Sequence, residues 1–101
     1  MNREHAVREP AVLARLRSDL LNAMFSKFPL ALSAERLQDS VSLAYLTRDL
    51  DWLTAAIKGE LTNLNQAGLI RSSAKGYLLT DKGRRDRQQV ARFMNSSNTP
   101  T

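Results

Sequence analysis

The sequence contains no cysteine and a single histidine, His5. The first absence excludes disulfide bonds and thiolate metal sites, and the two together argue against a transition-metal centre. His5 lies in a polar N-terminal stretch, which favours a bystander over a base or a ligand. The glycines, at positions 59, 68, 76 and 83, do not have the spacing of a phosphate-binding loop and instead mark breaks or turns. We therefore expect neither an enzyme nor a cofactor-binding protein.

Long apolar runs are also missing. No run approaches the roughly 20 residues needed to cross a bilayer. The first ten residues, MNREHAVREP, carry charges of both signs and no apolar stretch, so we expect no secretory signal, no membrane partner and a cytoplasmic location. A chain of 101 residues with 43% apolar content predicts one domain with a single core.

The charge of the chain is strongly one-sided along the sequence. Residues 1–70 carry eight Lys or Arg and eight Asp or Glu, whereas residues 71–101 carry seven basic and two acidic residues. The second segment therefore accounts for the whole net charge of +5. Nucleic acid is the commonest partner of such a basic surface, and the alternative is a solvated surface that binds nothing.

Apolar periodicity predicts two helices in the first half of the chain. Residues 1–9 resemble a flexible arm, and Pro10 suits the first position of a helix. The stripe of that helix repeats every three or four residues before Pro29 and comprises Leu13, Leu16, Leu20, Met24 and Phe28. Ser33 is a suitable N-cap for a short second helix with Leu37 and Val41 on its apolar side. Residues 43–45 then predict a turn or a minimal strand.

The second half predicts a longer helix, a hairpin and a closing helix. An inward stripe, with Thr47 as the cap and Gly68 as the stop, comprises Leu46, Leu50, Leu53, Ile57, Leu61 and Leu64. Residues 69–71 and 77–79 read as strands around a turn at 74–76, and Thr80 or Asp81 begins the last helix. Residues 95–101 suggest a disordered tail. The expected fold is mainly α with a small β-hairpin (α+β), as one domain over residues 10–94.

Two motifs resemble the winged helix-turn-helix domains of bacterial and phage regulators. Leu61 and Leu64 followed by AGLI at 67–70 are similar to the end of their recognition helix, and YLLTDKG at 77–83 is similar to their second wing strand. The chain also somewhat resembles small proteins of Mu-like prophages. The resemblance implies a small transcriptional regulator that places its third helix in the major groove of double-stranded DNA. It also implies that the hairpin, or wing, lies on the DNA backbone.

Projection of the third helix predicts its outward face. That face carries Arg48, Trp52, Ala55, Gly59, Thr62 and Gln66, with Lys58 and Asn63 beside them. Asp49 and Asp51 place negative charge at the end that would approach phosphates. The wing offers Arg71, Ser72, Ser73 and Lys75, and the last helix a basic stripe of Lys82, Arg84, Arg85, Arg87 and Arg92.

Alternatives to sequence-specific DNA binding remain open. The patch formed by Trp52, Ala55 and Gly59 would suit a protein partner, or the Trp52 ring would instead pack into the core. The basic surface would also serve a nucleic-acid or assembly factor without base readout. The apolar patch on the last helix either packs on the first helix or forms a homodimer contact, and it comprises Val90, Phe93 and Met94.

Overall fold

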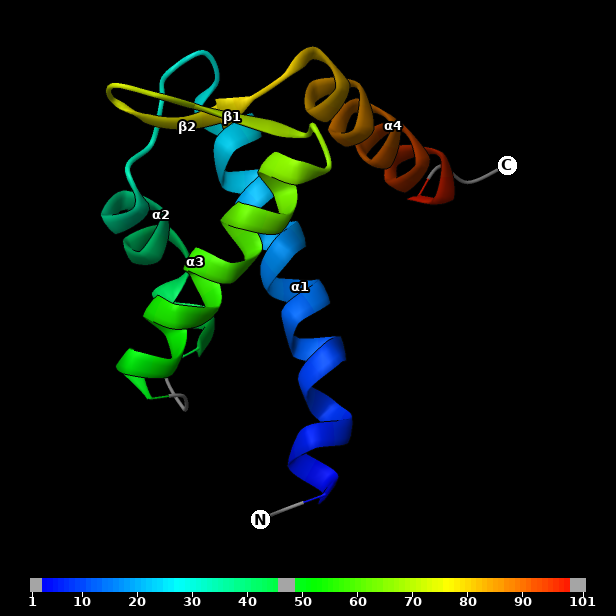
Figure 1. The fold of residues 1–101 in the computed structure, drawn as a ribbon. Helices are drawn as coiled ribbons and strands as arrows, with labels where there is room; N and C mark the ends of the chain where they lie inside the picture. The colour runs from blue at the N-terminus through cyan, green and yellow to red at the C-terminus, as the bar shows by residue number, and fades with distance from the viewer. Residues whose placement is uncertain (1–2, 46–48, 99–101) are drawn as a thin grey trace.

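The computed structural model describes residues 3–45 and 49–98, with side-chain environments for 10–45 and 49–93 (Figure 1). Its elements in chain order are α1 (Arg3–Lys27), α2 (Ala34–Val41), the 3₁₀ helix η1 (Ser42–Tyr45), α3 (Leu50–Gln66), β1 (Ile70–Ser73), β2 (Gly76–Leu79) and α4 (Asp81–Asn98). The described chain is thus mainly helical with a small antiparallel sheet, which confirms the α+β class.

The β1–β2 hairpin pairs Ile70 with Leu79 and Ser73 with Gly76. A third segment joins it, because Leu32, between α1 and α2, forms an isolated antiparallel bridge with Tyr77. Each of these two residues donates its N–H to the other's carbonyl oxygen, both at 2.8 Å. The sequence did not predict this bridge, which holds the hairpin against the start of α2.

The apolar core lies where α1, α2, α3 and the hairpin meet. Its buried residues come from each of these elements, from η1 and from the segment between α1 and α2, and they are Leu16, Leu20, Leu21, Met24, Leu32, Leu37, Val41, Tyr45, Leu53, Ile57, Leu61, Leu64, Ile70 and Leu79. Within the described part of the chain, α4 contributes none of them. Figure 1 shows α4 leaving the body beside the hairpin, and the N-terminal half of α1 projecting on its own.

Several element boundaries differ from the prediction. α1 begins at Arg3 and contains Pro10, although a proline inside a helix removes one hydrogen bond and crowds the carbonyl group four residues earlier. Residues 43–45 belong to a 3₁₀ helix rather than a strand. Thr47 lies outside the described residues, and Asp49 caps α3 by accepting a hydrogen bond from Asp51 N–H. α4 continues to Asn98, into the segment for which a disordered tail was expected.

The buried side of α3 is largely the predicted one, since Leu53, Ile57, Leu61 and Leu64 are buried, but it differs at the N-terminal end of the helix. Leu50 was placed inward but is 63% exposed, whereas Trp52 and Ala56 are partly buried and pack against the core. Glu60 on the same side is only 3% exposed. Its carboxylate accepts a 2.7 Å hydrogen bond from Arg17 Nε of α1, which compensates for the burial of its charge. A charged residue therefore occupies a position that apolar periodicity did not mark as inward.

Candidate nucleic-acid interface

Gly68 positions the hairpin at the C-terminal end of α3. Its φ of +77° is the left-handed conformation that ends a helix at low cost in glycine. The N–H of Gly68 bonds to the Asn65 carbonyl oxygen, and the N–H of Leu69 to the Leu64 carbonyl oxygen, both at 3.0 Å. These bonds turn the chain directly from α3 into β1, as the sequence predicted.

Thr80 joins the same corner to α4. Its hydroxyl donates to the Gly68 carbonyl oxygen at 2.6 Å and accepts from Gly83 N–H at 3.1 Å, so it caps α4. Lys82 Nζ donates to the Ala67 carbonyl oxygen at 3.0 Å. Lys82 therefore satisfies the end of α3, and its charge is held at that corner.

A groove of about 300 Å³ separates α3 from the inner face of the hairpin. It brings together three of the predicted site residues, Lys58, Thr62 and Ser72, and two that the sequence analysis missed, Asn65 and Tyr77. Asn65 follows Lys58 by seven residues, so helical spacing alone would have placed it on the same side of α3. Tyr77 carried no such signal, because its neighbourhood depends on strand pairing.

The outer face of the hairpin carries different residues. Arg71 lines a second depression with Phe28, Pro29, Leu78 and Asp81, and it does not reach the groove. This separation follows from the alternation of side chains along β1, which sends Arg71 and Ser72 to opposite faces. The predicted wing residues therefore do not form one site.

Hydrogen bonds show which hydroxyl groups of the interface are already engaged. The Ser73 hydroxyl donates to the Gly76 carbonyl oxygen and accepts from Lys75 N–H, so it stabilises the turn. The Thr62 hydroxyl donates to the Lys58 carbonyl oxygen at 3.0 Å. Ser72 differs from both because its oxygen accepts from Asn65 Nδ2 at 3.5 Å, which leaves the proton of its hydroxyl free to donate.

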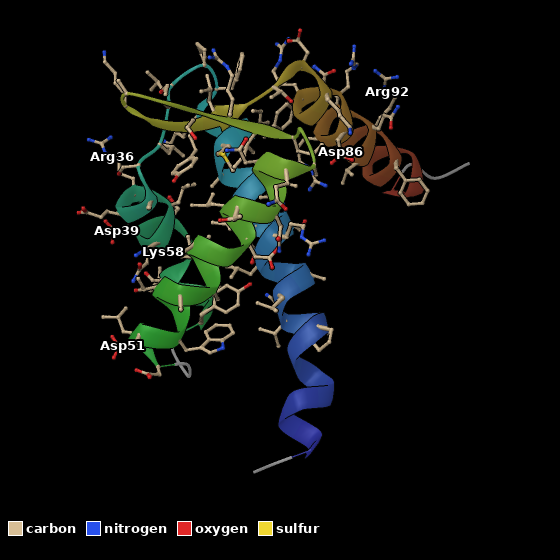
Figure 2. The ribbon with its side chains drawn as sticks, viewed as in Figure 1. Arg36, Asp39, Asp51, Lys58, Asp86 and Arg92 are labelled. Carbon is tan, nitrogen blue, oxygen red and sulfur yellow. The ribbon has the colours of Figure 1, made fainter. Side chains whose placement is uncertain are left out.

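The predicted basic stripe on α4 is divided between the surface and the interior. Arg87 is only 9% exposed, and its guanidinium donates to Ser18 Oγ and Asn22 Oδ1 of α1 at 3.2 Å each. Arg84 lies over the Phe28 ring at 4.6 Å and pairs with Asp81 at 3.0 Å. Both arginines therefore contribute to packing. Because α4 contacts α1, it cannot expose every residue of the predicted stripe to solvent. Arg85 and Arg92 are exposed, and Figure 2 shows Arg92 on α4, far from Arg36 and Asp39 on α2.

The remaining predicted residues have mixed positions. Arg48 lies outside the described residues, as does the side chain of Met94. Ala55 and Gly59 are exposed, whereas the Trp52 ring packs partly against the core. Val90 is 41% exposed and Phe93 72% exposed, and neither belongs to the apolar core.

Acidic residues dominate the N-terminal end of α3. Asp49 and Asp51 are both exposed there, and Figure 2 shows Asp51 at the end of α3 farthest from the hairpin. Lys58 lies about midway along the helix (Figure 2). The favourable surface for an anion is therefore the C-terminal half of α3 together with the hairpin.

Comparison with family models, with curated proteins and with solved structures finds no match to this chain. None of the helices in the described part of the chain is both long and apolar enough to cross a membrane. The described residues also contain no group of three or more His, Cys, Asp or Glu side chains placed to hold a metal ion.

Proposed function

We propose that the protein is a winged-helix DNA-binding protein, of the kind found among small bacterial and phage transcriptional regulators. The observation that carries the proposal is the arrangement of α3 and the hairpin. α3 ends at Gln66, shortly before Gly68, the hairpin folds back beside its last turns, and Leu32 adds a third short strand segment to β2. This order of helix, strand segment, helix, helix and hairpin supports the winged-helix proposal.

Charge supports DNA as the partner. Arg71 and Lys75 on the hairpin and Arg85 on α4 are exposed, and their side chains have no hydrogen-bond or ion-pair partner within the described residues. Cationic groups of this kind neutralise phosphates and release counterions. The acidic N-terminal end of α3 opposes the usual entry of a recognition helix into the major groove, so contacts to the backbone dominate the proposed binding.

A titration of duplex DNA at several salt concentrations tests the proposal. Wild-type protein should bind at low salt and lose affinity steeply as salt rises. The combined variant Arg71→Gln, Lys75→Gln and Arg85→Gln should flatten the plot of log affinity against log salt by about 0.9 for each phosphate contact removed. Arg15→Gln removes one exposed charge from α1 and is the matched control. Absence of wild-type binding at low salt would exclude the proposed function.

Binding of a protein partner at the α3 patch remains a prediction, but fewer residues of the patch now support it. Because Trp52 packs partly against the core, only Ala55 and Gly59 of the predicted patch are exposed for contact with a partner. A surface of two such small residues supplies little apolar area, and anchors of protein interfaces are usually large aromatic or arginine side chains.

A further inference from the structure

The groove between α3 and the hairpin is lined by hydrogen-bond donors. Five of its six residues have a polar side chain, and none of the six is a carboxylate: Lys58, Leu61, Thr62, Asn65, Ser72 and Tyr77. Leu61 is the one apolar residue of the lining, and its side chain is buried beneath the groove floor. A site with a fixed positive charge, neutral donors and no acid selects an anion.

Three of these donors have a proton to give. Neither Lys58 Nζ nor the Tyr77 hydroxyl has a hydrogen-bond partner among the described residues. The Ser72 hydroxyl accepts from Asn65 but does not donate. Lys58 comes from α3, whereas Ser72 and Tyr77 come from opposite strands of the hairpin, where they are cross-strand partners.

The hairpin wall of the groove is held in place by contacts outside it. The backbone of Tyr77 is fixed by its two hydrogen bonds to Leu32, and its ring packs against the core. Ser72 is fixed in register opposite Tyr77. The backbone of both residues and the ring of Tyr77 therefore hold their positions before any ligand arrives, which lowers the entropy lost on binding.

We propose that this groove is a binding subsite for one phosphodiester group of the nucleic-acid backbone. The inference rests on the proposed function and deepens it, because it places a phosphate between α3 and the hairpin rather than at the N-terminus of α3. Lys58 supplies the charge, and the Ser72 and Tyr77 hydroxyl groups donate to the phosphate oxygens. The groove opens to solvent, so a phosphate of the backbone can reach it.

A bound phosphate would also add polar contacts across the groove between α3 and the hairpin. The direct polar contact across the groove is the Asn65–Ser72 hydrogen bond, which is long at 3.5 Å. A phosphate bonded to Lys58 on one side and to Ser72 and Tyr77 on the other adds contacts across the same gap. DNA binding should therefore protect the amide protons of β1 and β2 from exchange more than those of α2.

The test uses the full chain and a mixed-sequence duplex of about 20 base pairs, long enough for several phosphate contacts. Lys58→Gln should flatten the salt dependence by about 0.9, because one phosphate contact loses its cation. Lys27→Gln, at an exposed lysine of α1, is the matched control and should leave the slope unchanged. Tyr77→Phe keeps the packed ring and should weaken binding about three- to ten-fold with no change of slope, since it removes one neutral donor.

The outcomes separate the subsite from the proposed function. If wild-type protein binds but Lys58→Gln, Tyr77→Phe and Ser72→Ala all bind equally well, the subsite is wrong while DNA binding stands. If wild-type protein does not bind, the proposed function is wrong as well. Competition with inorganic phosphate at constant ionic strength distinguishes a site for a DNA backbone phosphate from a site for free phosphate. If millimolar phosphate competes with DNA for wild-type protein but not for Tyr77→Phe, the groove is a site for free phosphate. The proposed backbone site would then be wrong. Should Tyr77→Phe fail to fold, Lys58→Gln and Ser72→Ala decide the question.

Discussion

Alanine at Gly83 would test how closely α4 approaches the end of α3. A Cβ atom at this position would overlap the Leu69 carbonyl oxygen and press on the Leu79 side chain. The oxygen is held in place because it accepts the Thr80 N–H at 3.1 Å. Overpacking of a well-packed site costs about 1–3 kcal/mol, and a clash with backbone favours the upper end of that range. Better helix propensity returns up to about 1 kcal/mol, so we expect a net loss of about 1–2 kcal/mol in the free energy of unfolding.

Gly59→Ala is the matched control for this substitution. Gly59 also lies within a helix, but a Cβ there would meet nothing within 4 Å. Only the helix propensity changes, so this variant should be about 1 kcal/mol more stable than wild type. Replacing glycine by alanine should therefore lower the free energy of unfolding at Gly83 and raise it at Gly59.

Urea unfolding followed by circular dichroism measures both variants under one set of conditions. The midpoints should move in opposite directions with unchanged m-values, which would show that stability and not the denatured state has changed. In thermal unfolding, each kcal/mol corresponds to about 4–8 °C in a domain of this size. If Gly83→Ala proved as stable as Gly59→Ala, the close approach of α4 to Leu69 would be refuted.

Three further substitutions test individual contacts. Burial, and then the hydrogen bond to Asp19, raise the pKa of Tyr45 to about 12 from 10.0. The stabilisation that the protonated Tyr45 hydroxyl gives the folded state is therefore complete below pH 10 and is lost as pH rises towards 12. Tyr45→Phe should cost about 1 kcal/mol at neutral pH and remove that part of the alkaline loss, as measured by urea unfolding across pH. Arg17→Met leaves the Glu60 carboxylate buried without its partner and should cost about 1–3 kcal/mol by the same assay; an unchanged midpoint would contradict the ion pair. Arg87→Met should increase hydrogen exchange in α4 with little effect on α3, and uniform exchange changes would argue against a local role.

The sequence predicted the corner between α3 and α4 well because local chemistry determines it. A glycine is the residue that best tolerates the positive φ at position 68, and a hydroxyl residue at position 80 is a suitable helix cap. The groove was only partly predictable. Lys58, Thr62 and Asn65 share a helix side by spacing alone, but their meeting with Ser72 and Tyr77 depends on the hairpin folding back.

Polar residues caused most of the errors in the predicted surfaces. Periodicity treats charged residues as outward, so it placed Arg87 on a solvent stripe and did not mark Glu60 as inward. Each contacts a polar partner from α1 that lies far away in sequence, and Arg87 also pairs with the adjacent Asp86 at 2.8 Å. On α3, Leu53, Ile57, Leu61 and Leu64 are buried as predicted, and the error concerns its N-terminal end and one flank. Leu50 was expected inward, but Trp52, Ala56 and Glu60 occupy the side that faces the body.

The composition of the core has a consequence for how this protein can vary. Because α4 supplies none of the core's apolar residues among those described, most changes to its outward side chains should alter stability by no more than about 0.5 kcal/mol. The charge on the outward side of α4 and the stability of the body are therefore almost independent properties. Under the proposed function, substitutions at positions such as Arg85 and Arg92 would adjust affinity for DNA gradually. Such a chain can be retuned to a new partner one charge at a time without first gaining stability elsewhere.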